Sequence, residues 1–439
     1  MNRIEFDVVV VGGGPAGLSA AYVLASKGVK VAVIEKGEYP GSKSVMGGVL
    51  YLNPLKEIIP NVVEELKSGK AVERNVIEQN MWLMGKDGIV KIGHRNERWK
   101  TDPNAFTVLR ANFDRWFAKK VEKAGALVIP KTKVEDFLRD GDGKIIGVRT
   151  TRPKGDVYCR AVVIAEGVNP ILTIKAGLRK EDLKPNMAAV AVKEIVDMPE
   201  EVVNSTFGVE SEEGTTIEIL GSWSEGLFGM GFIYSNKNSV SIGCGALISD
   251  IREKGIKPYK LLENLKNHPA VVDLLKEYRT QTKEYLAHLI PEGGYYAMPK
   301  VYGDRVLVCG DAAMLVNSIH REGSNHAITS GRFAAETLLE ALDAGDLSEK
   351  KLKAYEEKLR ESFILKDLKK YRDLMPTMEK NRQFVEIYPD LANDAIYRFL
   401  HVDGTPKWDV QREILDMVRE RRSLASLSLD LLKFWKSVR

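Results

Sequence analysis

The segment from Phe6 to Glu35 constrains the fold of this chain more than any other. It reads FDVVVVGGGPAGLSAAYVLASKGVKVAVIE. The apolar run Val8–Val11 predicts a buried parallel strand, a helix follows to about Lys27, and Val29–Ile34 predicts a second buried strand. A strand, a glycine-rich turn, a helix and a second strand form the pattern of a dinucleotide-binding βαβ unit.

The glycines of the turn have separate physical tasks. Gly12 permits the tight turn, Gly14 lets the backbone approach a pyrophosphate, and Gly17 lets the helix pack closely on the strand. Glu35 ends the second strand, where a carboxylate accepts hydrogen bonds from a ribose. A glycine turn in another α/β protein is the alternative, and the motif alone does not separate FAD from NAD. The expected dinucleotide contacts here are Gly12, Gly14, Pro15, Ala16, Gly17 and Glu35.

Composition narrows the functional class. With 65 Lys and Arg against 61 Asp and Glu, the net charge of +4 suggests no nucleic-acid partner. No apolar run approaches the length of about 18 residues that a spanning helix needs. The glycine motif begins so near Met1 that we expect no signal peptide, and therefore a place in the cytoplasm or, as a peripheral protein, on the cytoplasmic face of the cell membrane. The scattered Cys159, Cys244 and Cys309 do not suit an iron–sulfur cluster, so we expect no metal site.

The stretch Lys36–Tyr51 is rich in glycine and serine and predicts a loop folded over a ligand. An ordinary surface loop is the alternative. Further on, Phe106–Ala124 predicts a helix that begins near Arg110, where a cation could reach a phosphate or a ribityl group. A surface arginine is the plainer interpretation. The expected cofactor contacts from these two regions are Lys36, Ser42, Gly47, Gly48 and Arg110.

Three strands are predicted between residues 126 and 166. Residues 126–138 and 144–151 are joined by a hairpin turn of sequence DGDG, and residues 157–166 form an apolar strand that ends at an acid and a glycine. A buried strand that stops in this way indicates a backbone that passes close to the dinucleotide. The expected contacts are Val134, Ala165, Glu166 and Gly167.

A second strong signal lies in residues 306–336. A buried strand, 306–309, delivers Gly310 and Asp311, and a helix is predicted from about Gly323. The Asp311 carboxylate is suited to ribityl hydroxyls, and the start of the helix would stabilise negative charge on a reduced flavin. Backbone N–H groups facing the polar edge of the flavin are expected from Gly323, Ser324 and Asn325.

The distance between the two signals bears on the cofactor. A site assembled from segments almost 300 residues apart suits an extended FAD better than a contiguous NAD site, and no second G-x-G-x-x-G unit follows that would bind NADH. We nominate no catalytic acid–base side chain, because the chemistry belongs to the flavin. His320 and His326 lie near the second signal and either relay protons or only pack and hydrogen-bond.

Residues 185–250 alternate in the β manner and predict an antiparallel sheet, whereas residues 259–287 predict helices. Within the sheet, the stretch GLFGMGF at Gly226–Phe232 sets large apolar residues between glycines. It would line a cavity for an apolar substrate, touch a membrane, or form a hairpin with core side chains. The substrate residues expected here are Leu227, Phe228, Met230 and Phe232.

The C-terminal residues 346–439 predict charged helices, and the last of them, 423–439, is amphipathic. Its expected apolar face comprises Leu424, Leu427, Leu431, Leu432, Phe434, Trp435 and Val438. The surrounding basic residues are Arg419, Arg421, Arg422, Lys433, Lys436 and Arg439. Such a helix fits a membrane interface. The alternative is a helix docked on the body of the protein or on a partner subunit.

These residues resemble the FAD-dependent electron-transfer flavoprotein–quinone oxidoreductases, in particular their FixC-like branch. The resemblance covers nearly the whole chain, and its most specific parts are the loop Gly41–Tyr51 and the segment Gly310–Arg332. The other motifs that carry it are Gly12–Gly17 with Glu35, Phe106–Phe117, Ala165–Gly167, Gly229–Gly243, Asn267–Val271 and Glu292–Lys300.

The resemblance implies an α/β fold, α+β overall, of the glutathione-reductase-like type. In it, a Rossmann FAD-binding domain is assembled from distant segments and joined to an antiparallel-sheet substrate domain and a helical C-terminal region. We expect the FAD-binding domain in residues 1–55, 100–180 and 295–345, the quinone domain in 56–99 and 181–294, and the helical region in 346–439.

The resemblance also implies partners. Longer members of the family carry a four-cysteine iron–sulfur cluster near their C-terminus, and this chain has no cysteine after Cys309. Similarity to the FixC-like branch therefore implies a separate small ferredoxin-like subunit and a two-subunit electron-transfer flavoprotein as the electron source, which in that branch can bifurcate electrons from NADH. The expected function is electron transfer through FAD to a membrane quinone. The alternatives are a geranylgeranyl-reductase-like or aromatic-hydroxylase-like flavoenzyme, and a tethering subunit whose FAD is redox-silent.

Overall fold

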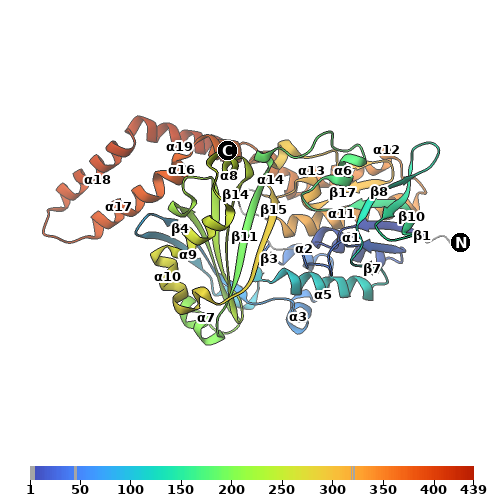
Figure 1. Ribbon diagram of the computed structural model, residues 1–439, viewed down its shortest axis with the longest axis horizontal. Coiled ribbons are helices and arrows are strands. Elements are labelled where there is room, and N and C mark those ends of the chain that lie inside the picture. The colour runs from blue at the N-terminus through green and yellow to red at the C-terminus, as the bar shows by residue number, and fades with distance from the viewer. Residues whose placement is uncertain (1–4, 44–46, 318, 320–321) are drawn as a thin grey trace. The chain divides into compact units, whose positions relative to one another are not determined.

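The chain folds into two compact units in the computed structural model, which describes residues 5–43, 47–317, 319 and 322–439 (Figure 1). Unit 1 comprises Met1–Glu73, Asn104–Ala188 and His288–Lys369, and unit 2 comprises Arg74–Pro103, Ala189–Ala287 and Lys370–Arg439. The division into FAD-binding, quinone-binding and C-terminal parts expected above is a statement about binding and stays a prediction.

Unit 1 is built around a mostly parallel sheet. The strands of this sheet are β1 (Glu5–Val11), β2 (Val31–Ile34), β7 (Leu127–Ile129), β8 (Val134–Arg139), β9 (Ile145–Thr150), β10 (Asp156–Ile164), β16 (Tyr302–Gly303) and β17 (Val306–Val308). Unit 1 also contains β3 (Val49–Tyr51) and β6 (Ala105–Thr107), which pair antiparallel with each other and are not part of this sheet. Its helices are α1 (Pro15–Ala25), α2 (Asn53–Lys56), α3 (Val62–Ser68), α5 (Arg110–Lys123), α6 (Ile171–Lys175), α11 (Ser324–Asp343), α12 (Glu349–Leu352), α13 (Ala354–Glu361) and α14 (Phe363–Lys370), with 3-10 turns η1 (Pro185–Met187), η4 (Gly294–Ala297) and η5 (Gly310–Ala313).

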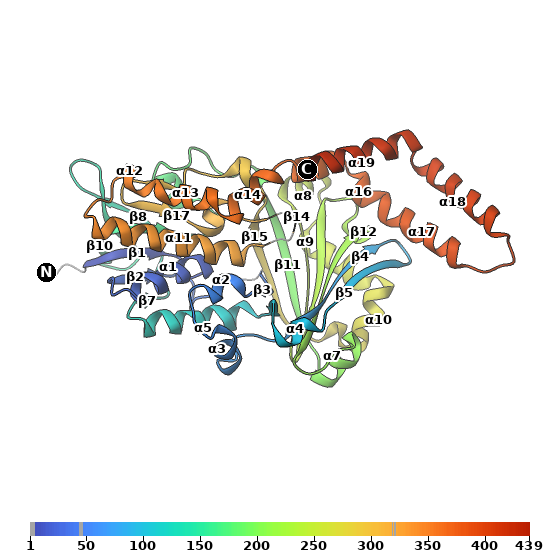
Figure 2. The same ribbon diagram turned by 180° about the vertical axis from the view of Figure 1, so that it is seen from behind.

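The strand order in this sheet is β16-β17-β10-β1-β2-β7, and the neighbours from β17 to β7 are parallel. The sequence explains the arrangement, because the run Val8–Val11 of β1 and the whole of β2 and β17 are continuously apolar and buried, as strands covered on both faces require. Helices α1 and α5 pack on this sheet, and α11 packs along α1 (Figure 2). A parallel sheet with helices on its faces is the Rossmann-type arrangement.

Two helices of unit 1 approach each other at backbone distance. A Cβ at Gly331 of α11 would lie 2.1 Å from the Ala16 carbonyl oxygen of α1, and the Ser19 hydroxyl donates a 2.7 Å hydrogen bond to the Ile328 carbonyl. Within the first turn, a Cβ at Gly17 would lie 2.0 Å from the Gly12 carbonyl oxygen. Only glycine fits at these positions, so the predicted role of Gly17 in close packing is confirmed.

Unit 2 contains a second, larger sheet. Its strands are β4 (Asn75–Met84), β5 (Ile89–Arg95), β11 (Ala188–Asp197), β12 (Glu213–Gly221), β13 (Gly229–Ser235), β14 (Ser239–Leu247) and β15 (Thr282–Pro291). Its helices are α4 (Arg98–Thr101), α7 (Glu200–Phe207), α8 (Ile248–Lys254), α9 (Pro258–Asn267), α10 (Pro269–Leu275), α15 (Leu374–Lys380), α16 (Gln383–Glu386), α17 (Tyr388–Leu400), α18 (Lys407–Arg421) and α19 (Leu424–Val438), with η2 (Ser222–Ser224) and η3 (Lys276–Thr280).

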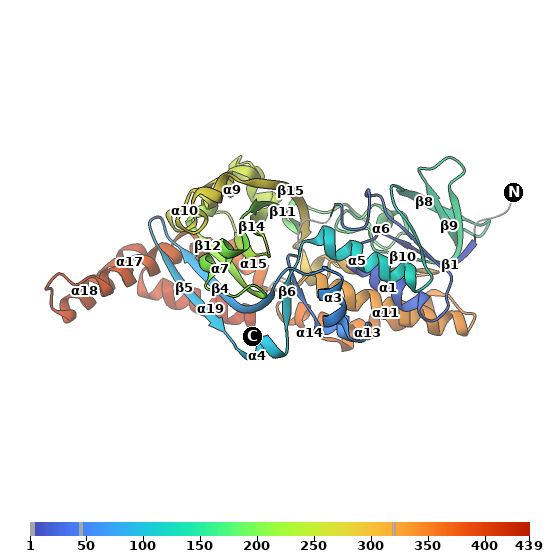
Figure 3. The same cartoon turned by 90° about the horizontal axis from the view of Figure 1, so that it is seen from below.

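The strand order of the second sheet is β15-β11-β14-β13-β12-β4, with β5 paired to β4. Strands β11 to β14 are antiparallel to their neighbours, as the alternating sequence predicts, while β12 and β4 run parallel. Helices α9 and α10 lie along one face of this sheet, where Leu265 meets Ile219 and the position above Gly231 (Figure 3). The opposite face, which α9 and α10 do not cover, carries Met230 and Phe232.

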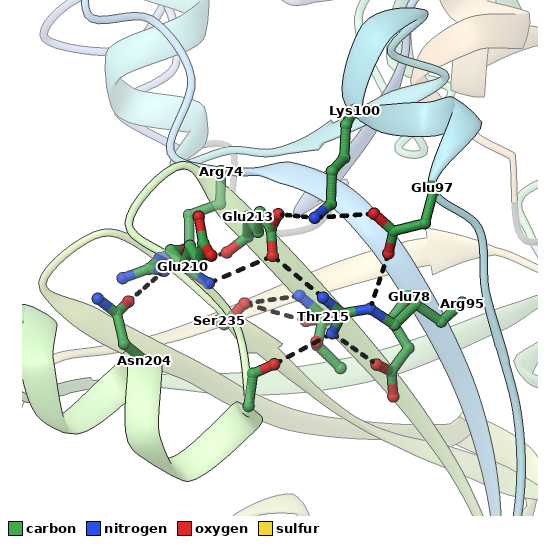
Figure 4. Close-up of polar contacts among 11 residues, drawn as sticks. Arg74, Glu78, Arg95, Glu97, Lys100, Asn204, Glu210, Glu213, Thr215 and Ser235 are labelled. Atoms are coloured by element: carbon green, nitrogen blue, oxygen red, sulfur yellow. Dashed lines mark hydrogen bonds and ion pairs between the residues drawn. The ribbon is translucent and has the colours of Figure 1, made fainter.

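A cluster of charges joins β5 and α4 to the start of β12 (Figure 4). Glu213 accepts from Lys100 at 2.7 Å and from Arg95 at 3.2 Å. Burial alone would raise the pKa of Glu213, but the Lys100 hydrogen bond and neighbouring cations outweigh it and lower the pKa. Beside the cluster, the fully buried Arg74 donates to the carbonyl oxygens of Glu210 and Glu213 and to the Asn204 side chain. The network therefore fixes the start of β4 and β12.

Two local predictions were wrong. Residues 126–138 form two short strands, β7 and β8, and not one. Residues 282–287 belong to strand β15, and not to a helix, because pairing with β11 outweighs a sequence pattern that suits either structure.

Candidate functional site

The glycine turn after β1 leaves open space at one position only among its three motif glycines. Gly12 has a φ of +109°, and a Cβ there would lie 2.2 Å from the Ala165 carbonyl oxygen. Gly14 precedes α1, and a Cβ there would meet no atom within 4 Å. The first N–H groups of α1 lack intrahelical acceptors, and no side chain caps them. The turn thus presents a bare backbone and a helix N-terminus to open space, as an anion requires.

Glu35 lies beside this turn at the end of β2. Its carboxylate is buried and accepts the Gly13 N–H at 2.7 Å and the Gly37 N–H. A carboxylate has about four lone-pair positions, so two remain for hydroxyl donors. The neighbouring Lys36 is exposed, and the Ser42 hydroxyl accepts the Tyr39 N–H at 3.4 Å.

Segments far apart in the sequence converge on this turn. Gly310 has a φ of +64°, and a Cβ there would lie 2.8 Å from the Ala16 Cβ. The position of a Cβ at Gly47 is 2.5 Å from the Ser324 hydroxyl oxygen and 3.0 Å from an Arg110 guanidinium nitrogen. The structure therefore brings the first turn, the 41–48 loop, the start of α5 and the start of α11 together in unit 1. Residues 44–46 of that loop lie outside the described residues.

Arg110 is buried at the start of α5. Its Nε and Nη2 donate to the two Asp114 oxygens at 2.8 and 2.7 Å, and the Asp114 side chain is fully buried. Burial works against the charged guanidinium, but the charge and hydrogen bonds of Asp114 prevail and raise the pKa of Arg110. Arg110 is thus not an ordinary surface arginine. Asp114 escaped the sequence analysis, although an acid four residues after a base on one helix is a readable signal.

Two titratable groups face the same cation. Burial raises the pKa of Asp311, and the positive charge of Arg110 opposes the shift. Burial also lowers the pKa of His288 from its ordinary 6.5 to about 4, and the charges of Arg110 and Lys36 lower it further. His288 lies in the part of β15 that belongs to unit 1, and it was not singled out from the sequence because its strand was not predicted.

The remaining predicted cofactor contacts of unit 1 have distinct positions. The Glu166 carboxylate accepts the N–H groups of Leu172 and Thr173 at 2.7 and 2.8 Å, so it caps α6, and burial raises its pKa. Next to it, Gly167 has a φ of +80° with open space at its Cβ. Of the others, Ala165 follows the end of β10, and Val134 is the first residue of β8. The Gly48 carbonyl accepts the Val108 N–H, and Gly323 and Asn325 lie at the start of α11.

Of the two histidines noted above, His326 lies in the first turn of α11. Its ring is fully buried, its Nε2 is 3.5 Å from a Glu322 oxygen, and neither nitrogen has a hydrogen-bond partner among the described residues. The ring meets Phe363 edge-on at 5.3 Å between centroids. His320 lies outside the described residues.

The four predicted substrate residues separate into two groups in unit 2. Met230 and Phe232 lie on the sheet face opposite α9, and the Phe232 ring stacks on Tyr234 at 4.8 Å. In contrast, Leu227 is part of the core beneath α9, and Phe228 packs on Leu247 and Val385. Leu227 and Phe228 thus fit the interpretation as core side chains, whereas the role of Met230 and Phe232 as substrate residues stays a prediction.

Known proteins resemble this chain over its length and in its parts. Residues 7–167 match the FAD dependent oxidoreductase family, and residues 374–439 match the ETF-QO/FixC family C-terminal domain. Protein FixC of Azorhizobium caulinodans is 43% identical over 99% of both chains, and protein FixC of Bradyrhizobium diazoefficiens is 43% identical over 100% of both. Among solved structures, a geranylgeranyl bacteriochlorophyll reductase-like protein from Thermoplasma acidophilum has a TM-score of 0.73 at 22% identity and covers 98% of this chain and 100% of its own.

The fold and the matched N-terminal region define an FAD-dependent oxidoreductase, with the mixed α/β architecture and helical C-terminal region that were expected. The likeness to the solved structure shows the fold of this chain and does not specify its reaction. The identity to the FixC proteins is decisive for the family. The chain belongs to the ETF-QO/FixC family, so the resemblance inferred from its motifs is confirmed.

The open space at Gly14 yields a first prediction. We expect Gly14→Ala to leave the folded flavin-free protein intact, because the backbone conformation suits alanine and the new methyl meets nothing. The same methyl would block the approach of a pyrophosphate, so FAD affinity should fall at least about tenfold, equivalent to about 1.4 kcal/mol. Fluorescence titration of the flavin-free protein measures the affinity, and Gly141→Ala, also in open space, is the control. Unchanged affinity would exclude the predicted pyrophosphate position.

His288 yields a prediction of pH dependence. Below pH 6.5 the unfolded chain binds a proton at His288 that the folded chain refuses until about pH 4, so stability falls as the pH drops through this window. The loss reaches at most about 3 kcal/mol. Urea unfolding of the flavin-free protein at pH 7 and pH 4.5 should show a smaller acid-induced loss in His288→Gln. The exposed His401→Gln is the control, and an equal loss in all three proteins would contradict the prediction.

Proposed function

We propose that this chain passes electrons through FAD from an electron-transfer flavoprotein to a quinone at the membrane surface. The observation that carries the proposal is the 43% identity to FixC proteins over 99% of the chain. The match of residues 374–439 to the ETF-QO/FixC family adds to it, because ETF-QO stands for electron-transfer flavoprotein–quinone oxidoreductase. When bound, FAD supplies the redox chemistry, and the protein supplies binding and electrostatics.

The geometry of unit 1 supports the proposed FAD contacts. An extended dinucleotide needs a bare backbone for its pyrophosphate, a carboxylate for its ribose and a polar segment for its ring. Gly14, Glu35 and the start of α11 provide these three features around one turn. Arg110, held by Asp114, directs a fixed positive charge at the same region, and the N-terminus of α11 favours negative charge there.

The cysteines support a separate iron–sulfur partner. Cys159, Cys244 and Cys309 are all buried, and burial raises the pKa of Cys159 and Cys309 to about 12. Such thiols stay protonated and do not form the four-thiolate set that a cluster requires. We therefore propose a small ferredoxin-like subunit beside a two-subunit electron-transfer flavoprotein, within an assembly that bifurcates electrons from NADH, as the FixC resemblance implies.

The proposed quinone wall is the sheet face of unit 2 that carries Met230 and Phe232. Glycines at 243 and 245 share this face, and the Phe232 ring covers the first of them, since a Cβ there would lie 2.3 Å from the ring. A stacked aromatic pair over glycines offers a flat apolar surface that suits a planar ring. Leu227, in the core, is no part of this proposal.

Unit 2 also supports contact with a membrane surface. None of the described helices combines the length and hydropathy that a membrane crossing needs. Helix α19 exposes six large apolar side chains, while Asp430 on its other side binds Gln383 and Tyr388. They are Leu424, Leu429, Leu431, Leu432, Phe434 and Trp435. A second exposed group lies around the α17–α18 connection, at Tyr397, Phe399, Leu400, Val402 and Trp408. Apolar faces of this size mark an interaction surface.

The quinone reaction is testable in the FAD-loaded protein. Flavin reduced anaerobically, by the electron-transfer flavoprotein or by one equivalent of dithionite, should regain its oxidised absorbance when a short-chain quinone is added. A quinol in place of the quinone is the control. Flavin that stays reduced would exclude the proposal, whereas oxygen-dependent consumption of NAD(P)H by the chain alone would identify a hydroxylase-like enzyme. Flavin that dithionite bleaches but the partner does not would indicate a tethering subunit.

The membrane contact is testable with vesicles. Leu431→Glu with Trp435→Glu should reduce cosedimentation with anionic lipid vesicles severalfold, because each charge opposes burial of the α19 face. Asn238→Glu with Ser205→Glu adds the same charge at exposed sites elsewhere in unit 2 and should sediment as wild type. If only Leu400→Glu with Val402→Glu abolishes binding, the contact belongs to the α17–α18 connection and the proposal for α19 fails.

A further inference from the structure

The turn before β13 is held in an unusual conformation. Glu225 and Gly226 both lie in the left-handed region, with φ of +52° and +74°, and Glu225 is not a glycine. Strained residues of this kind persist only where the surroundings hold them, and they gather at ligand clamps and switches. The turn leads to Phe228 and then to the proposed quinone wall at Met230 and Phe232, so the inference below rests on the proposed function.

A buried carboxylate holds the end of this turn. The Phe228 N–H donates to Asp250 Oδ2 at 3.1 Å, and only 3% of the Asp250 side chain is exposed. Arg382 binds both carboxylate oxygens, with Nη2 to Oδ1 at 2.6 Å and Nη1 to Oδ2. A bidentate pair fixes orientation as well as position. The backbone at Phe228 is therefore fixed by a residue more than 150 positions later in the chain.

Arg382 directly precedes the short helix α16, which touches the turn again. Val385 packs on Phe228, and a Cβ at Gly226 would lie 2.3 Å from Glu386 Oε1. Lys254 donates to the Glu225 carbonyl at 2.7 Å and lies 3.8 Å from Glu386. Arg382 before α16, and Val385 and Glu386 within it, thus contact the turn or the carboxylate that holds it.

The same helix is tied to α19. Gln383 of α16 donates to Asp430 Oδ1 at 2.9 Å, and the hydroxyl of Tyr388, the first residue of α17, donates to Asp430 Oδ2 at 2.6 Å. Arg422 pairs with the same carboxylate at 2.6 Å, and only 1% of Asp430 is exposed. Asp430 therefore anchors the C-terminal helix to α16 from the side opposite its exposed apolar face.

We propose that Asp250 and Arg382 are positioning residues for the Phe228 turn, and that α16 couples this turn to helix α19. The Asp250 and Asp430 carboxylates are both buried and bind adjacent residues, Arg382 and Gln383, at the start of the four-residue helix α16. A displacement of α19 would therefore move Arg382 relative to Asp250. A membrane surface that covers the exposed face of α19 would thereby tighten the turn at the quinone wall. Access of quinone is then linked to membrane contact.

The Phe228 amide reports the coupling directly, because its hydrogen bond ends on Asp250. Hydrogen exchange of the FAD-loaded protein, followed by mass spectrometry, should be about tenfold faster at Phe228 in Arg382→Gln, as expected when a hydrogen bond to a charged acceptor loosens. Asp430→Asn should accelerate Phe228 in the same direction by severalfold. If Arg382→Gln folds poorly, Arg382→Lys takes its place. It keeps the charge and should give an intermediate exchange rate at Phe228.

The matched control is the exposed Arg419–Asp416 pair of α18, of the same chemistry at 3.0 Å. Arg419→Gln should leave Phe228 exchange at the wild-type rate. An unchanged rate in Arg382→Gln would overturn the positioning role. Faster exchange in α19 without any change at Phe228, in Asp430→Asn, would overturn the coupling.

A kinetic arm separates this inference from the proposed function. In Arg382→Gln, the KM for a short-chain quinone should rise at least about fivefold with kcat within about twofold, because the wall and not the flavin is disturbed. Wild-type protein that does not reduce quinone at all would defeat the proposed function, while the exchange experiment would still decide the coupling. A fall in kcat without a rise in KM would contradict the positioning role at the wall.

Discussion

The structure depends on close backbone contact at a few glycines of unit 1. Gly17 lets α1 approach its own preceding turn, Gly331 lets α11 approach the Ala16 carbonyl, and Gly310 lets the η5 turn approach the start of α1. Without these contacts, segments almost 300 residues apart could not meet at one turn. A side chain at any of the three would need backbone displacement, since the nearest atoms are backbone or a short Cβ. The proposed dinucleotide site therefore depends first on packing, and only then on binding chemistry.

Buried charges set the second constraint, and each is paired. Arg110 with Asp114, Asp250 with Arg382, and Asp430 with Arg422 are salt bridges in which one carboxylate is almost fully buried. Removing one partner of a pair buried on both sides, such as Arg110 and Asp114, costs about 3–5 kcal/mol, far more than an exposed pair contributes. Orientation is what these pairs provide: Asp114 aims a cation at the converging segments, and Asp250 holds a turn. The two roles explain why charges were retained where apolar side chains would pack.

Local signals determined which features could be predicted from the sequence. The start of α11 at Ser324, strand β1 and the packing role of Gly17 were correctly predicted, because glycines, apolar runs and caps act within a few residues. Strand β15 was missed, since its identity comes from pairing with β11, about 90 residues earlier in the chain. Leu227 and Phe232 share one apolar pattern, yet opposite environments decide their roles. Arg382 is one arginine among many until the fold brings it to Asp250.

The C-terminal region shows how a helix can be both docked and available. The sequence left two interpretations of α19 open, a helix in a membrane interface or a helix docked on the body. In the structure, one side of the helix is docked and the other side is exposed. Asp430 lies on the docked side and is held by three donors, whereas Leu431 and Trp435, one and five residues later, are exposed by 62% and 61%. Apart from Phe434, whose ring packs on Phe384 at 6.0 Å between centroids, the docking contacts of α19 named here are polar, which leaves most of its large apolar residues for another surface. Because the contact from Gln383 comes from α16, the docked side provides the proposed route from α19 to the Phe228 turn.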